Sequence, residues 1–230
     1  FDVLILGDSQ VGKSSLLFQF IHNQYYESLP SVEELCRKMI PDPENEKFYE
    51  FTFLDSLATN DMHNTSKKQQ ILNSTAIMFV YSITSQCSFD TVEDQVNRVK
   101  SLGKDVPIML VATKTDELDE RQVSYEQGLQ LSHQINAIGF VECSAKENTH
   151  VREAFQPIID RILPTKVHQL STDIIQLSGG LQPLDSLPLM TDEDELPIQT
   201  PRATDKSEIR SKQTIEVTSL DKKQSCCVIV

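Results

Sequence analysis

Short apolar runs alternate with longer amphipathic stretches from Phe1 to about Leu163. Short apolar runs bounded by turn residues are typical of buried strands, whereas apolar residues recurring every three to four positions are typical of helices packed on one face. Together the two patterns predict βα units that form a mostly parallel sheet. The expected buried strands read VLIL, YEFTFLD, AIMFVYSI, PIMLVAT and GFVEC.

Helices are expected between these strands, at residues 14–23, 67–74, 88–102, 124–138 and 150–162. The third carries an apolar stripe at helical spacing, made of Phe89, Val92, Val96 and Val99. We expect this stripe to pack on the sheet. Pro157 removes one backbone hydrogen bond from the last segment, which predicts a kink or a late helix start.

An antiparallel hairpin is expected near the N-terminus, because LCRKMI and YEFTFLD are joined by the turn-prone PDPENEK. The pattern therefore predicts an α/β fold with a six-stranded, mostly parallel sheet, one antiparallel edge strand and helices on both faces. After Pro164 the chain becomes polar, with SGG and TDEDELP. This change predicts one folded domain at residues 1–164, followed by a disordered linker over residues 165–225.

Composition narrows the possible partners and compartments. A net charge of −13 disfavours nucleic acid as a partner. The five cysteines lack disulfide-framework or metal-ligand spacing, which indicates a reducing, cytosol-facing compartment. The opening FDVLILG has no basic segment and reads as a first strand, and without an initiator Met the first few residues of the domain are expected to be missing. No apolar run approaches the ~18 residues of a membrane span.

The strongest chemical signal is GDSQVGKS at residues 7–14, which matches G-x-x-x-x-G-K-[ST]. It falls between an expected strand and an expected helix, the context that separates a phosphate-binding loop from a chance match. Glycines let backbone N–H groups point at phosphate oxygens, and the helix N-terminus favours an anion. Lys13 is expected to reach the β- and γ-phosphates, and Ser14 to offer its hydroxyl to Mg²⁺.

Three further motifs follow strands and so are expected at the carboxyl edge of the sheet, where open α/β folds bind ligands. Asp55 ends FTFLD and suits a hydrated Mg²⁺, although a solvated strand-end carboxylate is the alternative. Asp116 in VATKTD can accept two hydrogen bonds from guanine, whereas adenine does not offer this pair of donors. The alternative interpretation of TKTD is a plain turn. In ECSAK, the small Ser144 and Ala145 allow a backbone amide close to a base, and Ser144 is equally suited to capping a helix.

These motifs, in this order, make residues 1–163 resemble the Ras superfamily of small GTPases, which have a P-loop NTPase fold and bind GTP or GDP with Mg²⁺. The resemblance implies that Tyr25 flanks the guanine, that Lys114 lies against the ribose and the phosphate loop, and that Ser31 reaches Mg²⁺ and the γ-phosphate. The implied nucleotide-binding residues are Gly7, Gln10, Val11, Gly12, Lys13, Ser14, Ser15, Tyr25, Ala58, Thr113, Lys114, Asp116, Ser144, Ala145 and Lys146. The implied metal residues are Ser14, Ser31 and, through water, Asp55.

The chain departs from the family pattern where the family reads D-T-A-G-Q or D-T-A-G-E, because residues 55–59 read DSLAT. Ala58 keeps an N–H for the γ-phosphate, but its Cβ restricts the backbone. Thr59 stands at the position of the glutamine that orients the attacking water in the Ras template, and threonine is too short for that role. Lesser departures are the bulky Gln10, Ser31 for threonine, and Thr113 for asparagine. Intrinsic hydrolysis, with Lys13 and Thr59 at the catalytic positions, is therefore expected to be slow.

The last four residues, CVIV, match C-a-a-X and predict prenylation of Cys227, with Cys226 as a candidate for palmitoylation. Since one lipid gives only reversible attachment, a second signal is expected. The final segment, 226–230, is thus expected to be a lipidation signal that attaches the protein to the cytoplasmic face of a membrane, with the plasma membrane as the first expectation.

Two functions are compatible with the residues. The first is a monomeric GTPase switch that works with an exchange factor, an activating protein and effectors; the second is a hydrolysis-deficient GTP-binding scaffold regulated by exchange or localisation. A P-loop kinase is disfavoured because it would need arginines gathered over the phosphates. The candidate arginines are instead scattered along the chain, at Arg37, Arg98, Arg121, Arg152 and Arg161.

Overall fold

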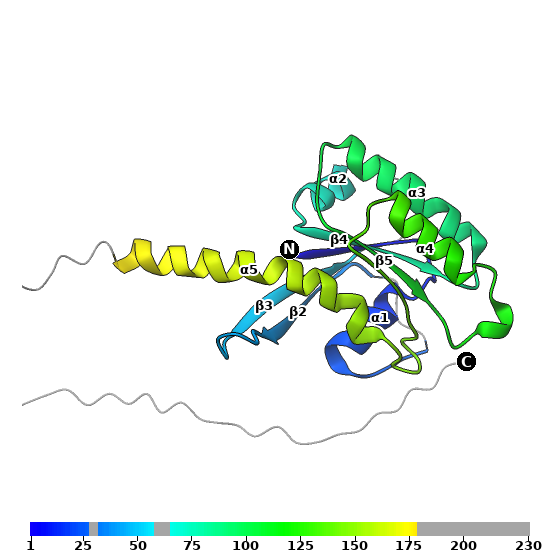
Figure 1. The fold of residues 1–230 in the computed structure, drawn as a ribbon, viewed down its shortest axis with the longest axis horizontal. Coiled ribbons are helices and arrows are strands. Elements are labelled where there is room, and N and C mark those ends of the chain that lie inside the picture. The colour runs from blue at the N-terminus through cyan, green and yellow to red at the C-terminus, as the bar shows by residue number, and fades with distance from the viewer. Residues whose placement is uncertain (28–31, 58–64, 179–230) are drawn as a thin grey trace, which may run out of the picture. The chain divides into compact units, whose positions relative to one another are not determined.

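A six-stranded sheet in the order β2-β3-β1-β4-β5-β6 lies at the centre of the computed structural model (Figure 1). The structure describes residues 1–27, 32–57 and 65–178. The strands are β1 (Val3–Leu6), β2 (Glu34–Pro41), β3 (Phe48–Asp55), β4 (Ala76–Ser82), β5 (Ile108–Thr113) and β6 (Gly139–Glu142). β2 pairs antiparallel with β3, and the described strands otherwise pair in parallel, so the predicted fold class is confirmed.

Helices cover both faces of the sheet, as the alternation of the chain predicts. They are α1 (Lys13–His22), α2 (Thr65–Leu72), α3 (Gln86–Ser101), α4 (Tyr125–Gln134) and α5 (Val151–Ser178), with a short 3₁₀ helix η1 (Leu118–Glu120). In Figure 1, α1 and α5 lie on one face and α2, α3 and α4 on the other. Val3 and Ile5 of β1 belong to the core under α1 and α5, whereas Leu4 and Leu6 belong to the core under α3, because successive strand residues point to opposite faces.

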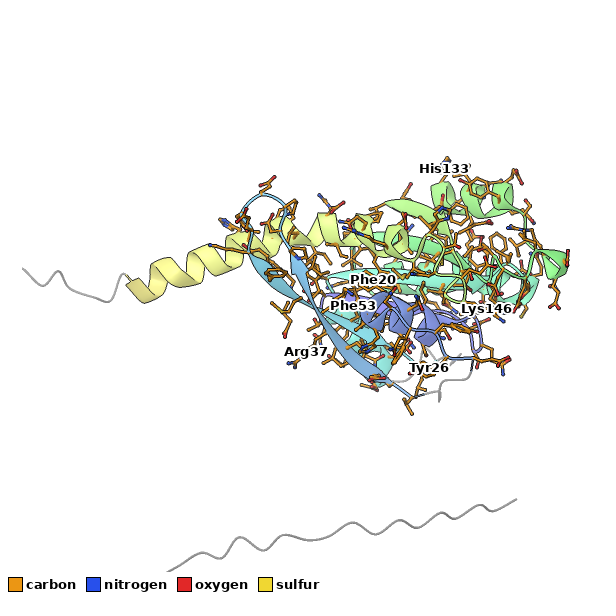
Figure 2. The ribbon with its side chains drawn as sticks, turned by 90° about the horizontal axis from the view of Figure 1, so that it is seen from below. Phe20, Tyr26, Arg37, Phe53, His133 and Lys146 are labelled. Atoms are coloured by element: carbon orange, nitrogen blue, oxygen red, sulfur yellow. The ribbon has the colours of Figure 1, made fainter. Side chains whose placement is uncertain are left out.

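Two aromatic contacts fix α1 against the sheet. The Phe20 ring stacks on Phe155 of α5 at 4.0 Å between centroids and meets Phe53 of β3 edge-on at 5.6 Å. Figure 2 shows Phe20 and Phe53 side by side. On α3, the expected stripe packs on the sheet: Val92, Val96 and Val99 are buried, and Phe89 is half-buried against the same core.

Helix α5 is longer than the sequence pattern predicts. It begins at Val151, so the late start considered for Pro157 is wrong, and it ends at Ser178 instead of near residue 162. Residues 165–178 are thus helical, and the expected disordered linker cannot begin at residue 165. Lys166 stabilises the turn just beyond Pro164, because its ammonium lies 2.8 Å from an oxygen of Asp2 and over the Phe51 ring.

All described residues fall within one compact unit, Phe1–Gln182. Within them, no helix combines the length and apolar character that a membrane span requires. The predicted linker after Ser178 and the CVIV signal with Cys226 and Cys227 lie outside the described residues.

Gly128 makes α4 fit closely on the sheet, which gives a stability prediction. A Cβ at this position would lie 2.4 Å from both Phe140 Cζ and Tyr81 Oη. We expect Gly128→Ala to lower the free energy of unfolding by about 1–3 kcal/mol, because Tyr81 is fully buried and its ring cannot move aside without disturbing the core. Urea denaturation measures this, with Gln130→Ala on the exposed side of the same helix as the control. A Gly128→Ala variant as stable as the Gln130→Ala variant would contradict the packing described here.

Candidate functional site

The loop between β1 and α1 has the backbone shape that its glycines predict. At Gly7 the backbone φ is +153°, and a Cβ would lie 2.1 Å from the Val80 carbonyl oxygen. Gly12, with φ of +91°, is the N-cap of α1, and no side chain caps the first N–H groups of that helix. Gln10 also has a positive φ, 63°, which is uncommon for a residue other than glycine. The strand–loop–helix context of the motif is confirmed, and the helix N-terminus is available to an anion.

Lys13 lies folded over this loop. Its ammonium donates hydrogen bonds to the carbonyls of Gly7 at 2.9 Å and Asp8 at 2.7 Å, and the side chain is buried. Burial lowers the pKa of Lys13, although the charges of Asp55 and Asp8 act in the opposite direction. A buried ammonium held against the loop is well placed to receive phosphate oxygens.

Asp55 and Ser14 form the centre of the expected metal site. The Ser14 hydroxyl donates a short hydrogen bond to Asp55 Oδ2. Asp55 is only 5% exposed, and its Oδ1 has no hydrogen-bond partner among the described residues. Burial raises the pKa of Asp55, against the Ser14 hydrogen bond and the charge of Lys13, which lower it. A buried carboxylate oxygen without a partner, beside a hydroxyl, fits Mg²⁺, which prefers oxygen ligands.

The base-reading motifs come together from two separate loops. Ser144 donates a hydrogen bond to Asp116 Oδ1 at 2.6 Å, and Lys146 Nζ lies 3.9 Å from Asp116 Oδ2. The Asp116 side chain is 9% exposed, whereas that of Lys146 is 62% exposed. Ala145, which stands between Ser144 and Lys146 in the chain, is buried. The structure therefore joins TKTD and ECSAK around one oriented carboxylate.

Thr113 links the two halves of the site. Its hydroxyl donates a short hydrogen bond to the Val11 carbonyl of the phosphate loop and lies 3.0 Å from the Tyr81 carbonyl. Thr113 is 2% exposed, so its hydroxyl serves to position the loop. This connection between the base motif and the phosphate loop was not foreseen from the sequence.

Of the remaining predicted site residues, the structure describes three, and three others lie outside the described residues. Tyr25 is 38% exposed just after α1, and Ser15 is half-buried in its first turn. Lys114 has a positive φ of 64°, and its carbonyl accepts a hydrogen bond from the Glu117 N–H at 2.9 Å. Ser31, Ala58 and Thr59 lie outside the described residues, so their assigned roles stay predictions.

Comparison with known proteins identifies the family. The Ras family profile matches residues 2–164. The chain belongs to the Ras family of small GTPases. It is 34% identical over 158 residues to "Ras-like protein rasU" of Dictyostelium discoideum, which covers 67% of this chain and 71% of that protein. It is 35% identical over 163 residues to "Ras-like protein 1" of Saccharomyces cerevisiae, which covers 69% of this chain and 51% of the yeast protein.

A third relative extends the similarity further along the chain. "Ras-like protein rasW" of Dictyostelium discoideum is 33% identical over 186 residues, or 78% of this chain and 82% of that protein. Small GTPases of the Ras family are signalling switches that bind GTP and GDP, generally with Mg²⁺, and work with regulators and effectors. The predicted membership of the Ras superfamily is confirmed.

This Ras-family GTPase also contains site residues that the sequence reading missed. The Asp8 carboxylate accepts hydrogen bonds from Thr91 and Gln95 of α3, which anchor the phosphate loop. On α2, Lys67 contacts Ser56 beside the predicted metal residue Asp55. The sequence offered no signal for Lys67, because its burial is visible only in the folded chain.

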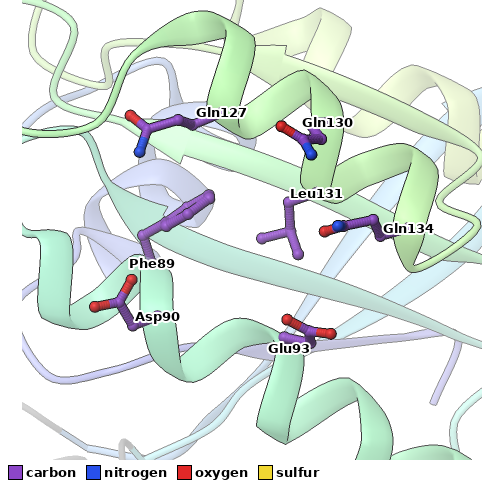
Figure 3. Close-up of a pocket in the computed structure, with 7 residues that line it drawn as sticks. All are labelled: Phe89, Asp90, Glu93, Gln127, Gln130, Leu131 and Gln134. Atoms are coloured by element: carbon purple, nitrogen blue, oxygen red, sulfur yellow. The ribbon is translucent and has the colours of Figure 1, made fainter.

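A surface hollow between α3 and α4 is separate from these residues (Figure 3). It is lined by Phe89, Asp90, Glu93, Gln127, Gln130, Leu131 and Gln134. None of these residues belongs to the phosphate loop, the Asp55 site or the Asp116 site, so the hollow is distinct from the nucleotide site of the Ras-family fold.

Proposed function

We propose that this protein is a GTP-binding molecular switch with slow intrinsic hydrolysis, which acts in signal transduction at a membrane surface. The observation that supports it best is the hydrogen bond between Ser14, in the first turn of α1 after the phosphate loop, and Asp55, which directly precedes the divergent residues 56–59. In such a switch, the γ-phosphate and Mg²⁺ order the segments around Ser31 and Ala58, and effectors recognise the ordered surface.

Each part of the site has a task in nucleotide binding. Lys13 neutralises charge on the β- and γ-phosphates, while the loop N–H groups donate to phosphate oxygens. Ser14, and Asp55 through water, would hold Mg²⁺, which would supply further neutralisation of that charge when bound. Asp116 accepts hydrogen bonds from the guanine N1–H and amine, and the bond from Ser144 holds its carboxylate in one orientation.

Slow hydrolysis follows from the residues after Asp55. Phosphoryl transfer depends mainly on positioning and electrostatic stabilisation, so it suffers when the group that positions the water is lost. Thr59 cannot hold both the attacking water and a phosphate oxygen, whereas Ala58 retains an N–H for the γ-phosphate. Binding of GTP is therefore expected to persist while turnover is weak.

Thr59→Gln tests this explanation of slow turnover. We expect the substitution to raise the single-turnover rate of GTP hydrolysis roughly 10- to 100-fold, because it restores a side chain long enough to orient water. Phosphate release from GTP-loaded protein measures the rate. Thr65→Gln, the same change at the exposed first residue of α2, is the control and should leave the rate unchanged. An unchanged rate in the Thr59→Gln protein would remove the role given to position 59.

The second candidate function is a hydrolysis-deficient GTP-binding scaffold, and the residues DSLAT favour it.

One assay distinguishes the hydrolase from the scaffold: single-turnover phosphate release from GTP-loaded protein is measured with and without cell extract. Strong acceleration by extract indicates an activating protein and excludes the scaffold. Bound GTP that persists for hours in both reactions excludes the hydrolase. Failure to bind either GTP or GDP would refute both functions.

The proposed setting is a monomer attached to the cytoplasmic face of a membrane, with the plasma membrane as the first expectation. The support is the terminal CVIV, with Cys227 for a prenyl group and Cys226 for palmitate. An exchange factor, an activating protein and effectors complete the proposed partners. Mass spectrometry of the C-terminal peptide from eukaryotic cells tests the anchor, and a free, untrimmed Cys227 would exclude it.

A further inference from the structure

Asp8 is an acidic residue inside the phosphate loop, and the proposed function assigns no role to its side chain. Backbone N–H groups and Lys13 suit this loop to an anion, whereas a carboxylate in it would repel a phosphate group. The structure directs both carboxylate oxygens to α3 instead. Oδ2 lies 3.1 Å from the Thr91 hydroxyl, and Oδ1 lies 3.3 Å from the Gln95 amide nitrogen. Two neutral donors outside the loop thus accommodate the charge of Asp8.

The Thr91 hydroxyl has one proton and two acceptors within reach. These are the Ser88 carbonyl, one turn back in the helix at 3.0 Å, and Asp8 Oδ2 at 3.1 Å. The carboxylate is the stronger acceptor because it is charged. Asp8, Thr91 and Gln95 are all half-buried, which strengthens a hydrogen bond relative to one in open water. The proton of Thr91 is therefore better used on Asp8 than within the helix.

The backbone of Asp8 contacts the lysine of the site. The Lys13 ammonium donates to the Asp8 carbonyl at 2.7 Å and to the Gly7 carbonyl at 2.9 Å. A residue has only two soft backbone dihedrals, so a restraint on the Asp8 side chain also limits the directions that its carbonyl can take. Asp8 therefore connects α3 to the ammonium that is assigned to the β- and γ-phosphates.

Helix α3 is a firm support for these donors. The three valines of its apolar stripe are buried in the core. At its start, the Ser88 hydroxyl accepts a hydrogen bond from the Ser82 N–H at the end of β4, at 3.1 Å. Thr91 and Gln95 are four residues apart and so lie on the same side of the helix. The two donors are thus presented together by an element that is fixed on the sheet.

We propose that Thr91 and Gln95 are positioning residues of the nucleotide site, which hold the Asp8 carboxylate on α3 and thereby slow the release of bound nucleotide. Held in this way, the carboxylate is kept from the bound phosphates, and the Asp8 carbonyl stays on the Lys13 ammonium. Without the two donors, a free carboxylate beside the anion site and a less restrained ammonium both weaken phosphate binding. This inference rests on the proposed GTP-binding function.

The rate at which the full-length protein releases a fluorescent GDP analogue, with Mg²⁺ present, tests the proposal. We expect Thr91→Val combined with Gln95→Met to raise this rate about tenfold, because the changes keep the side-chain shapes and remove hydrogen bonds to a charged group. Gln130→Met, on the exposed side of α4, is the matched control and should keep the wild-type rate. Thr91→Ser retains the hydroxyl and should release the analogue nearly as slowly as the wild type. An unchanged rate in the double variant would overturn the proposal.

A double-mutant cycle with Asp8→Ala separates positioning through Asp8 from a purely structural role of Thr91 and Gln95 in α3. Asp8→Ala removes the carboxylate on which both donors act. In this background, Thr91→Val and Gln95→Met should therefore cause no further change in the release rate. An increase of the same size with and without the carboxylate would show that the two residues act in another way, and the proposal would be wrong.

Thermal unfolding of each nucleotide-free variant shows whether it folds. If the double variant does not, Thr91→Val alone replaces it in both measurements, with an expected increase of about threefold for the single hydrogen bond. If wild-type protein binds neither GTP nor GDP, the proposed function itself fails. If wild-type protein binds GDP and the folded variants release it at the wild-type rate, only the role of Thr91 and Gln95 fails.

Discussion

Asp116→Asn is expected to lower the affinity for GTP by roughly 10²- to 10³-fold and to raise the affinity for xanthosine triphosphate. The carboxylate offers two acceptors, which match the guanine N1–H and amine. An asparagine amide places its NH₂ against the guanine amine, so one charged hydrogen bond is lost and one buried donor is left unpaired. Xanthine has a carbonyl in place of that amine and can accept from the amide. Competition titrations with a fluorescent nucleotide measure both affinities.

Asp119→Asn is the matched control for this experiment, because Asp119 is exposed in η1 and makes no contact with the Asp116 cluster in the described part of the chain. It should leave both affinities unchanged. The Asp116 side chain is 9% exposed and held by Ser144, so an asparagine should occupy the same place. Wild-type protein that binds ATP as tightly as GTP would remove the role assigned to Asp116.

Lys13→Met is expected to weaken GTP binding by roughly 10²-fold or more while leaving the nucleotide-free fold about as stable as the wild type. The loss of binding follows because the ammonium is the buried cation beside the phosphate loop. The retained stability follows because burial lowers the Lys13 pKa, so its charge is unfavourable to the nucleotide-free folded state at pH values below that pKa. Methionine removes that cost and keeps most of the apolar side chain.

Lys38→Met is the matched control for Lys13→Met, because it removes a lysine with similar contacts that lies away from the phosphate loop. The Lys38 ammonium also donates to backbone carbonyls, those of Phe20 and Ile21 at the far end of α1, and burial also lowers its pKa. It lies outside the phosphate loop, so Lys38→Met should spare the affinity for GTP and, like Lys13→Met, leave the nucleotide-free fold about as stable as the wild type. Denaturation without nucleotide and titration with GTP give the two quantities for each variant. A Lys13→Met protein that binds GTP normally would contradict the assigned site.

Local patterns determined most of the fold in advance. The strand segments were recognisable because they are short, apolar and bounded by turn residues, and the hairpin because PDPENEK separates two such segments. The phosphate loop, Asp55, Asp116 and Ser144 were recognisable because each follows a strand, and parallel strands bring their carboxyl ends to one edge of the sheet. Contiguous residues and their spacing carry this information.

The end of α5 was not predictable in the same way. Pro157 and Pro164 each remove a backbone hydrogen bond, and a local reading places a kink or an end there. Ile158, Ile159 and Ile162 are buried in the core, and Lys166 contacts Asp2 and Phe51. These contacts stabilise the helix from distant parts of the chain.

The sequence by itself thus determined the family, the α/β fold and the order of the nucleotide-binding motifs, because these depend on residue type at short spacing. Only the tertiary structure decided which polar groups meet. It joined Thr113 to the phosphate loop, Ser144 to Asp116, and Lys67 to Ser56 and Leu57. Such contacts depend on burial and on neighbours remote in sequence. A lysine on a short polar helix has no local feature that distinguishes a solvated side chain from one buried beside a phosphate site.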